Sequence, residues 1–275
     1  SKTNEARMTL RIGWFTTGRG PGSRGLFESI QRQIIQGTLE AHIEFVFSNR
    51  ERGESSVTDK LFDVIESHNI PLITLSSDRI YRSIRGSTNQ KRLEYDSIVM
   101  DDLSKFTPQI CLLAGYMLIV GPAMSDYYTM INLHPSIPGG PSGTWQQVIW
   151  ETIRTKPDKT GAMIHIVTND LDKGPPISYF SFPIDQGPLR DSWNEIKNIP
   201  LEHLISNHGQ SLSIFQRLRY EEYRRESLLI AETIRSITTG EISLKYMEHL
   251  KNNVLSPKPL CLNTTIEASI KLTSG

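Results

Sequence analysis

The sequence predicts an α/β protein with an open, mostly parallel, Rossmann-like sheet of about seven strands and helices on both faces. Three observations support this fold class. Short apolar runs alternate with segments of helical spacing from about residue 10 to residue 184. A Gly-rich segment, 17–25, separates the first apolar run from the first helical pattern. Asn132 and His134 each follow an apolar residue at the end of another run, which Pro135 stops.

The elements alternate along the chain. Strands are predicted where apolar residues run together, at 10–16, 43–48, 71–75, 110–114, 130–133, 162–167 and 177–184. Helices are predicted where apolar residues recur three and four apart, at 26–36, 56–68, 92–106 and 145–154, with a short helix opened by Gly121-Pro122.

The pattern changes after Ile184. Residues 185–200 read as a polar connector, and 201–239 read as strongly helical until Gly240 caps the segment. We therefore predict an α/β domain at 9–184 and a helical C-terminal extension at 185–250 that packs on it. The remaining segments, 1–8 and 251–275, are predicted to be irregular tails.

Composition excludes several classes of protein. The 275 residues include 30 basic and 30 acidic ones, so no global field favours nucleic acid or membrane partners. Neither a membrane-spanning apolar stretch nor a signal-peptide core is evident. The two cysteines, Cys111 and Cys261, are far apart, which predicts a reducing, cytoplasmic setting with no disulfide framework and no metal site.

Asn132, His134 and Asp172 offer the groups needed to move an acyl carbon onto an amine. An amide can donate a hydrogen bond to a developing oxyanion, an imidazole can stabilise that charge and pass a proton, and a carboxylate can orient the imidazole. Asn132 and His134 alternate, so they share one side of an extended segment. Strand ends of this kind are where open α/β sheets bind ligands.

These residues resemble the folate-dependent formyltransferases, and within them most closely the phosphoribosylglycinamide formyltransferases. The order and approximate spacing of the motifs hold from about Leu10 to Ile184. Beside the Asn-His pair, the resemblance is carried by Val46-Phe47-Ser48-Asn49-Arg50, Arg92-Leu93-Glu94-Tyr95-Asp96, Leu113-Ala114-Gly115-Tyr116-Met117 and Val167-Thr168-Asn169-Asp170-Leu171-Asp172.

The resemblance implies transfer of a formyl group from 10-formyltetrahydrofolate to a primary amine, most closely glycinamide ribonucleotide in purine biosynthesis. Asn132 and His134 would stabilise the tetrahedral oxyanion, and Asp172 would assist proton transfer. The folate cosubstrate would contact Arg92, Met117, Leu118, Val120, Val167, Asn169 and Asp170. The amine substrate, a small ribonucleotide, would contact Gly22, Ser23, Arg24, Gly25, Arg219 and Glu222. His165 is expected to be structural or to support the site from behind.

The segment Gly20-Pro21-Gly22-Ser23-Arg24-Gly25 has two further interpretations. It matches G-x-G-x-x-G, which is typical of dinucleotide-binding folds, but the second strand ends in Ser48-Asn49-Arg50, without the acidic residue that holds a ribose. Glu51 lies past the expected position. Free N–H groups at a helix N-terminus still favour an anion here. A tight turn that needs glycine is the remaining interpretation.

Three departures from the family leave the amine acceptor open. Leu118 stands where an arginine is common, the 137–146 loop brings Trp145 and Gln146 in place of polar residues, and the segment between Ile184 and Glu222 is longer. The acceptor is therefore glycinamide ribonucleotide, another amine, or water, as in a 10-formyltetrahydrofolate hydrolase. More distant alternatives are an NAD-binding enzyme and a non-catalytic folate-binding protein. The protein is expected to be a monomer or a homodimer.

Overall fold

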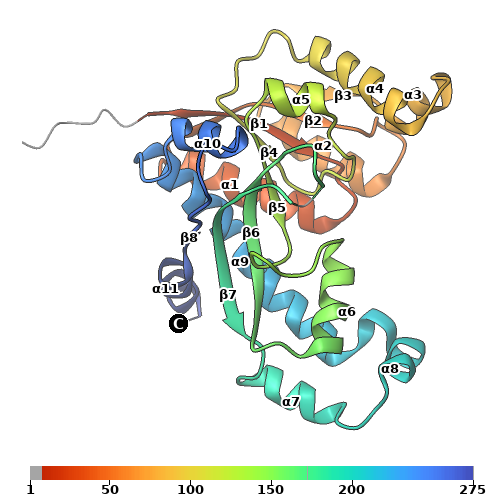
Figure 1. Ribbon diagram of the computed structural model, residues 1–275, viewed down its shortest axis with the longest axis vertical. Helices are drawn as coiled ribbons and strands as arrows, with labels where there is room; N and C mark the ends of the chain where they lie inside the picture. The colour runs from red at the N-terminus through yellow and green to blue at the C-terminus, as the bar shows by residue number, and fades with distance from the viewer. Residues whose placement is uncertain (1–7, 172, 275) are drawn as a thin grey trace, which may run out of the picture. The chain divides into compact units, whose positions relative to one another are not determined.

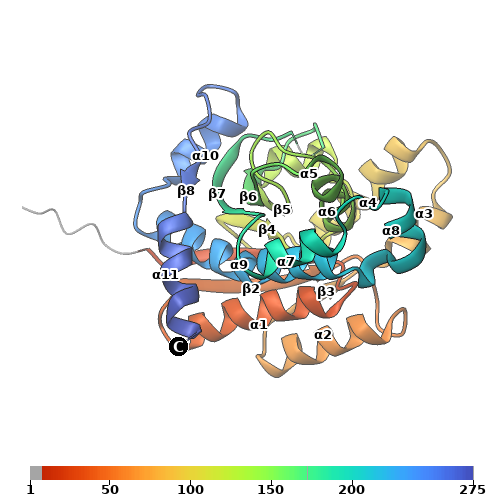
Figure 2. The same ribbon diagram turned by 90° about the horizontal axis from the view of Figure 1, so that it is seen from below.

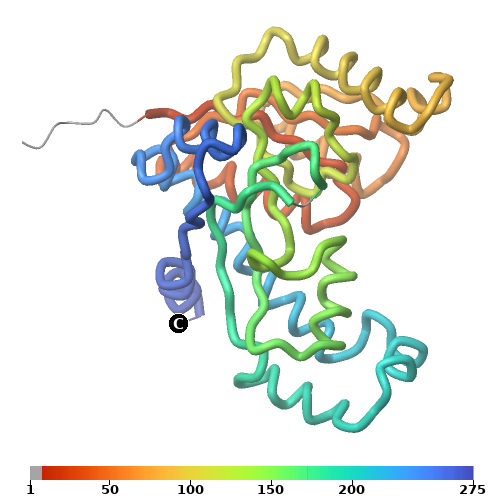
Figure 3. The backbone as a smooth tube through the Cα atoms, viewed as in Figure 1, coloured from red at the N-terminus to blue at the C-terminus, as the bar shows by residue number. Residues whose placement is uncertain are grey.

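The computed structural model describes residues 8–171 and 173–274 and forms two compact units. The first unit comprises Ser1–Leu133, His165–Ile177 and Thr233–Lys258. The second comprises His134–Ile164, Ser178–Glu232 and Pro259–Gly275. Each unit is built from three separate segments of the chain, whose backbone Figure 3 traces from red at the N-terminus to blue at the C-terminus. The domain division at residue 184 stays a prediction.

The strands form one open sheet in the order β3-β2-β1-β4-β5-β6-β7-β8 (Figure 1). Parallel pairing joins β1 to β2 and β4, β2 to β3, β4 to β5, and β7 to β8. The sheet is mixed and mostly parallel, as predicted, with eight strands rather than seven. Its strands are β1 (Leu10–Thr16), β2 (Ala41–Ser48), β3 (Leu72–Thr74), β4 (Ile110–Leu113), β5 (Met130–His134), β6 (Lys159–Ile166), β7 (Pro176–Pro183) and β8 (Leu260–Cys261).

Helices cover both faces of the sheet in the first unit. Figure 2 shows α1 (Pro21–Ile35) and α2 (Ser56–Ser67) on one face of β1–β3, with α4 (Thr88–Asp102) and α5 (Pro122–Tyr127) on the other. This arrangement follows from strands that are apolar on both sides. The unit also contains α3 (Ser77–Ser83), which was not predicted, and α10 (Leu244–Lys251).

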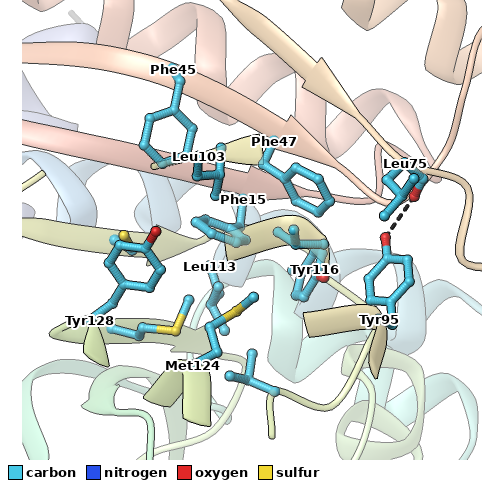
Figure 4. Packing of buried hydrophobic residues seen from close by; sticks show 14 residues of the cluster. Phe15, Phe45, Phe47, Leu75, Tyr95, Leu103, Leu113, Tyr116, Met124 and Tyr128 are labelled. Carbon is cyan, nitrogen blue, oxygen red and sulfur yellow. Dashed lines mark hydrogen bonds between the residues drawn. The ribbon is translucent and has the colours of Figure 1, made fainter. Parts of the chain in front are cut away.

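The core of the first unit is built from alternate residues of β1. Trp14 points to one face and meets Phe27 of α1 at 5.7 Å between ring centroids. Phe15 points to the other face and packs edge-on against Tyr116 at 5.5 Å (Figure 4). The same cluster holds Tyr95 of α4, whose hydroxyl donates to the Leu75 carbonyl over 2.6 Å. This packing ties the helices to the sheet and so fixes the strand ends.

The second unit is mainly helical. Its helices include α6 (Trp145–Thr155), α7 (Pro188–Glu195), α8 (Leu201–His208), a short 3₁₀ turn η1 (Gly209–Ser211), and most of α9 (Ser213–Thr238). The prediction of a polar connector at 185–200 was wrong, because this segment contains α7. Pro188 suits a first helical turn, and the Trp193 indole donates to the Ile184 carbonyl over 2.8 Å. Across the described residues, no helix has the length and apolar character to span a membrane.

The irregular tail predicted for 251–275 was also wrong within its described part. Residues 260–261 add β8 to the edge of β7, and α11 (Asn263–Thr273) follows. The Asn263 side chain accepts from the Ser181 N–H over 2.8 Å, and Ile266 and Ile270 are buried. Ile266 and Ile270 are four residues apart, and the segment forms a helix because these two side chains have a surface to pack on. Residues 1–7 lie outside the described part.

Candidate functional site

Asn132 and His134 lie at the carboxyl end of β5, between β4 and β6 in the sheet, as expected. Residues two apart in a strand share a side, so the two side chains point the same way. Pro135 has no N–H to continue the ladder, and the Ser136 N–H turns back to the His134 carbonyl over 2.9 Å. The strand therefore ends with an amide and an imidazole side by side.

The amide of Asn132 is oriented by His165. Nδ2 of Asn132 lies 3.2 Å from Nε2 of His165, and Nδ1 of His165 lies 2.9 Å from the Ile166 carbonyl oxygen. A carbonyl only accepts, so Nδ1 carries the proton and Nε2 accepts from Asn132. This uses one N–H of the Asn132 amide and leaves its second N–H for another acceptor.

His134 is buried, with 3% of its surface exposed, and is held by the loop that follows it. Its Nε2 lies 3.1 Å from the carbonyl oxygen of Pro141. Since the carbonyl only accepts, Nε2 carries a proton and donates to it. The 137–146 loop, which departs from the family pattern, therefore sets the orientation of the imidazole.

The same loop ends at Trp145, the first residue of α6. Thr144 caps this helix through a capping box with Gln147. The Trp145 ring lies 4.3 Å from the guanidinium carbon of Arg219, and Arg219 also lies 5.3 Å from the ring of Tyr223. Trp145 is thus engaged by a cation from α9.

Arg219 belongs to a buried charge cluster with Glu222 and Glu226, called here the Arg219 cluster. Its Nη1 donates to Glu222 over 3.0 Å and to Glu226 over 2.8 Å, and the two glutamates are 1% and 4% exposed. Burial, followed by the charge of Glu226, raises the pKa of Glu222 well above its ordinary value, against the opposing effect of Arg219. Burial thus favours the protonated form of Glu222, while the hydrogen bond from Arg219 favours its charged form.

The segment after β6 contains the other residues expected around the folate. The Val167 N–H donates to the Met130 carbonyl over 2.8 Å, which joins the segment to β5. Asn169 accepts from the Ser125 hydroxyl of α5 over 3.1 Å, whereas Asp170 is exposed. Asp172 lies outside the described residues, so its predicted role stays a prediction.

The loop at 115–121, called here the donor loop, joins β4 to α5 and contains three of the predicted folate contacts. Met117 is 45% exposed, Leu118 is half-buried and Val120 is buried. The loop ends at Gly121, whose N–H donates to the Asp96 carboxylate of α4 over 2.7 Å. The predicted contacts therefore lie on one continuous stretch of backbone.

Asp96 and Arg92 occupy one face of α4 next to the donor loop. Asp96 is 2% exposed, and burial raises its pKa to about 6, although the Gly121 N–H and the charge of Arg92 act in the opposite direction. A β carbon built on Gly121 would lie 3.5 Å from Cγ of Arg92. Arg92, the predicted folate contact, thus lies directly beside this end of the loop.

The Gly-rich segment is helical rather than a loop. α1 begins at Pro21, so Gly22, Ser23, Arg24 and Gly25 form its first turns. Sequence reasoning placed the helix start at Leu26 because glycine and proline disfavour helix interiors, but proline is compatible with a first turn. Arg24 pairs with Glu28 one turn along at 3.4 Å.

Glu51, the carboxylate nearest the ribose position of a dinucleotide fold, is already engaged. It pairs with Arg79 over 2.7 Å, and the Arg79 guanidinium lowers the pKa of the Glu51 carboxyl. The structure thus adds nothing to the NAD-binding interpretation.

Comparison with known proteins agrees with this geometry. Residues 19–198 match the family model described as formyl transferase. The chain belongs to the formyl transferase family. Phosphoribosylglycinamide formyltransferase of Escherichia coli is 24% identical over 177 residues, which cover 64% of this chain and 74% of that protein. The Saccharomyces cerevisiae protein of the same name is 28% identical over 180 residues, covering 61% and 79%.

Other members of the formyl transferase family carry a different name. Formyltetrahydrofolate deformylase of Haemophilus influenzae is 28% identical over 143 residues, 50% of this chain and 44% of that protein. Among solved structures, phosphoribosylglycinamide formyltransferase of Coxiella burnetii superposes with a TM-score of 0.59 at 20% identity, covering 85% of this chain and 89% of that one. The likeness at this identity shows the fold.

Sequence reasoning missed several buried polar residues near the candidate site. Thr17 and Asn49 are buried immediately after β1 and β2, and Glu226 completes the Arg219 cluster. Thr17 and Asn49 could have been found as the first polar residues beyond the strand ends. Glu226 lies four residues after Glu222 and so shares its helix face.

Proposed function

We propose that this formyl transferase moves the formyl group of 10-formyltetrahydrofolate to a primary amine, with glycinamide ribonucleotide as the acceptor to test first. Family membership supports the reaction class. The observation that carries the proposal is the Asn132–His165 hydrogen bond, because it leaves one amide N–H at the end of β5 beside the imidazole of His134.

The chemistry assigned to these residues follows from their donors. The amine nitrogen attacks the formyl carbon, and the carbonyl oxygen takes the negative charge of a tetrahedral intermediate. The second N–H of Asn132 is suited to that charge, and so is the Nε2–H of His134 once it leaves the Pro141 carbonyl. On collapse the bond to the folate nitrogen breaks, and that nitrogen receives the proton lost by the amine. Asp172 is assigned to orient His134 and assist this transfer.

The donor would be held on the first unit. Met117, Leu118 and Val120 would contact it mainly through backbone groups, with Arg92 beside them and Val167, Asn169 and Asp170 on the segment after β6. The pterin ring of the folate carries hydrogen-bond acceptors along its edge. The backbone N–H groups of the donor loop can donate to these acceptors. No metal is assigned a role.

The acceptor assignments use two further regions. Gly22, Ser23, Arg24 and Gly25 form the first turns of a 15-residue helix, where N–H groups and the helix dipole favour a phosphate. Arg24 can pair with the same anion. Arg219 and Glu222 are assigned to the amine or ribose end, and this requires the Arg219 cluster to rearrange on binding.

The test follows release of deformylated folate from 10-formyl-5,8-dideazafolate by absorbance, with and without glycinamide ribonucleotide. Turnover that requires the amine supports the proposal. Donor binding without turnover in the presence of this amine rejects glycinamide ribonucleotide as the acceptor.

A hydrolase is the second candidate. The 28% identity to formyltetrahydrofolate deformylase favours it, as does the closure of Glu222 within the Arg219 cluster. A hydrolase would use Asn132, His134 and Asp172 in the same roles, with water as the nucleophile. Folate release at the same rate with and without the amine would establish this reading.

A further inference from the structure

Side chains from other elements fix both ends of the donor loop. The Met117 N–H donates to the Thr17 hydroxyl oxygen over 2.9 Å, and the Gly121 N–H donates to Asp96 over 2.7 Å. Thr17 follows β1, and Asp96 lies on α4, so the loop is attached to two separate supports.

Thr17 is itself held by a chain of buried polar groups. Its hydroxyl donates to Oδ1 of Asn49 over 2.6 Å, and Nδ2 of Asn49 donates to the Ser77 hydroxyl oxygen over 3.0 Å. The three residues are 3%, 5% and 7% exposed. The Ser77 hydroxyl donates its one proton to the backbone carbonyl of Asn49 over 3.4 Å, so it can only accept from the Asn49 amide, and this sets the directions of donation along the chain. A paired network of this kind permits one arrangement.

Between the two anchored positions, the loop offers donors without protein partners. Among the described residues, no group accepts from the N–H of Leu118, Ile119 or Val120. Backbone donors near the surface of a rigid loop suit a ligand that carries a row of acceptors. Their spacing is set by where Met117 and Gly121 are held.

We propose that Thr17, Asn49 and Ser77 form a relay that positions the donor loop for the formyl donor. They are positioning residues, because they act through the Met117 backbone rather than through contact with the donor. This inference rests on the proposed function. It assigns part of the affinity for the donor to residues that directly follow β1 and β2 and that begin α3.

The test measures the dissociation constant of 10-formyl-5,8-dideazafolate by calorimetry, which requires no acceptor. Thr17→Val keeps the shape but removes the hydroxyl, and we expect binding about tenfold weaker, as one lost hydrogen bond implies. Thr17→Ser keeps the hydroxyl and should bind within about twofold of wild type. Thr152→Val is the matched control, since its buried hydroxyl donates only within α6.

Kinetics supply a readout that general destabilisation would not move selectively. With the acceptor that supports turnover, Thr17→Val should raise the KM for the donor about tenfold and leave kcat within about twofold. A fall in kcat with unchanged KM would overturn the relay, because the defect would then lie in the chemistry. Equal donor affinity in wild type and Thr17→Val would overturn it as well.

The proposed function and the relay fail in different ways. A wild-type protein that binds no folate analogue overturns the proposed function and the role of the relay with it. A wild type that binds tightly beside an equally tight Thr17→Val overturns the relay alone. If Thr17→Val does not fold, Ser77→Ala removes the hydroxyl at the far end of the relay, with its two hydrogen bonds to Asn49, and should weaken donor binding about threefold. Unchanged binding in that variant would count against the relay.

Discussion

Buried polar groups support the donor loop and also make up the Arg219 cluster, but the chemistry of the two regions differs. The relay behind the loop is neutral and holds one backbone N–H group, that of Met117. The Arg219 cluster is made of three ionisable side chains, and each depends on the others for its charge balance. Backbone recognition tolerates changes of side chain, such as Leu118 in place of arginine. A buried charge cluster does not, so the two regions should respond differently to substitution.

The largest effect on the rate of folate release should come from removing the imidazole of His134. His134→Ala removes the imidazole at the end of β5, and we expect folate release to slow by at least about 10²-fold, the usual scale of general acid–base catalysis. Asp172→Asn should slow it by a similar factor. The measurement is the rate of deformylation at saturating donor.

The control for this test is His208→Ala, which removes an exposed histidine of α8. Its rate should match wild type. If His134→Ala retains full activity, His134 takes no part in the reaction.

The next effect separates the charged region from the neutral one. Arg219→Met leaves two buried carboxyl groups without their cation, and should lower the free energy of unfolding by about 3 kcal/mol. Glu222→Gln imitates the protonated acid that burial favours, and should cost less than about 1 kcal/mol. Urea unfolding of both variants measures the difference. Equal losses would show that Glu222 is ionised in the folded protein.

Asp96 tests the one charged support of the donor loop. Its folded pKa of about 6 exceeds the ordinary value of 3.8, because burial outweighs the Gly121 N–H and Arg92. Its contribution to stability is therefore fully present below pH 3.8 and is lost as the pH rises through 6. Tyr81 and Tyr116 also face this carboxyl and do not titrate in that range.

Asp96→Asn should remove this pH dependence while its amide oxygen still accepts from Gly121. Relative to wild type, the variant should gain about 2 kcal/mol in unfolding free energy between pH 4 and pH 7. Chemical denaturation at the two pH values provides the measurement. A constant difference between the variants would place the folded pKa of Asp96 near its ordinary value.

The smallest effect should be the change in affinity for the folate analogue when one side chain of the donor loop is replaced. Leu118→Arg restores the cation common in the family at an accessible loop position, and should tighten binding of the folate analogue about threefold. Calorimetry with the same analogue tests this. Weaker binding would mean that the loop depends on the leucine side chain, contrary to recognition through the backbone.

The sequence predicted the sheet well because its strands are buried on both faces and appear as plain apolar runs. It misplaced the start of α1, since Gly20, Pro21 and Gly22 favour a turn until a helix N-terminus is known to begin there. It missed α11 because Ile266 and Ile270 indicate a helix face only once there is a surface to bury them.

The site was predictable where its chemistry follows neighbours in the chain. Asn132 and His134 are two apart on one strand, so strand geometry alone aligns them. The Thr17–Asn49 hydrogen bond joins residues 32 positions apart, and depends on the parallel register of β1 and β2. The contact between Trp145 and Arg219 likewise depends on how α6 and α9 pack within the second unit.

The two-residue strand β8 has a consequence for self-association. Ser178 and Tyr179 of β7 pair with Leu260 and Cys261, after which the chain leaves the sheet as α11. A sheet edge this short offers few unpaired backbone groups to another strand. A chain cut before Leu260 would expose these outer backbone groups of β7, and we expect it to pair with a second molecule more readily.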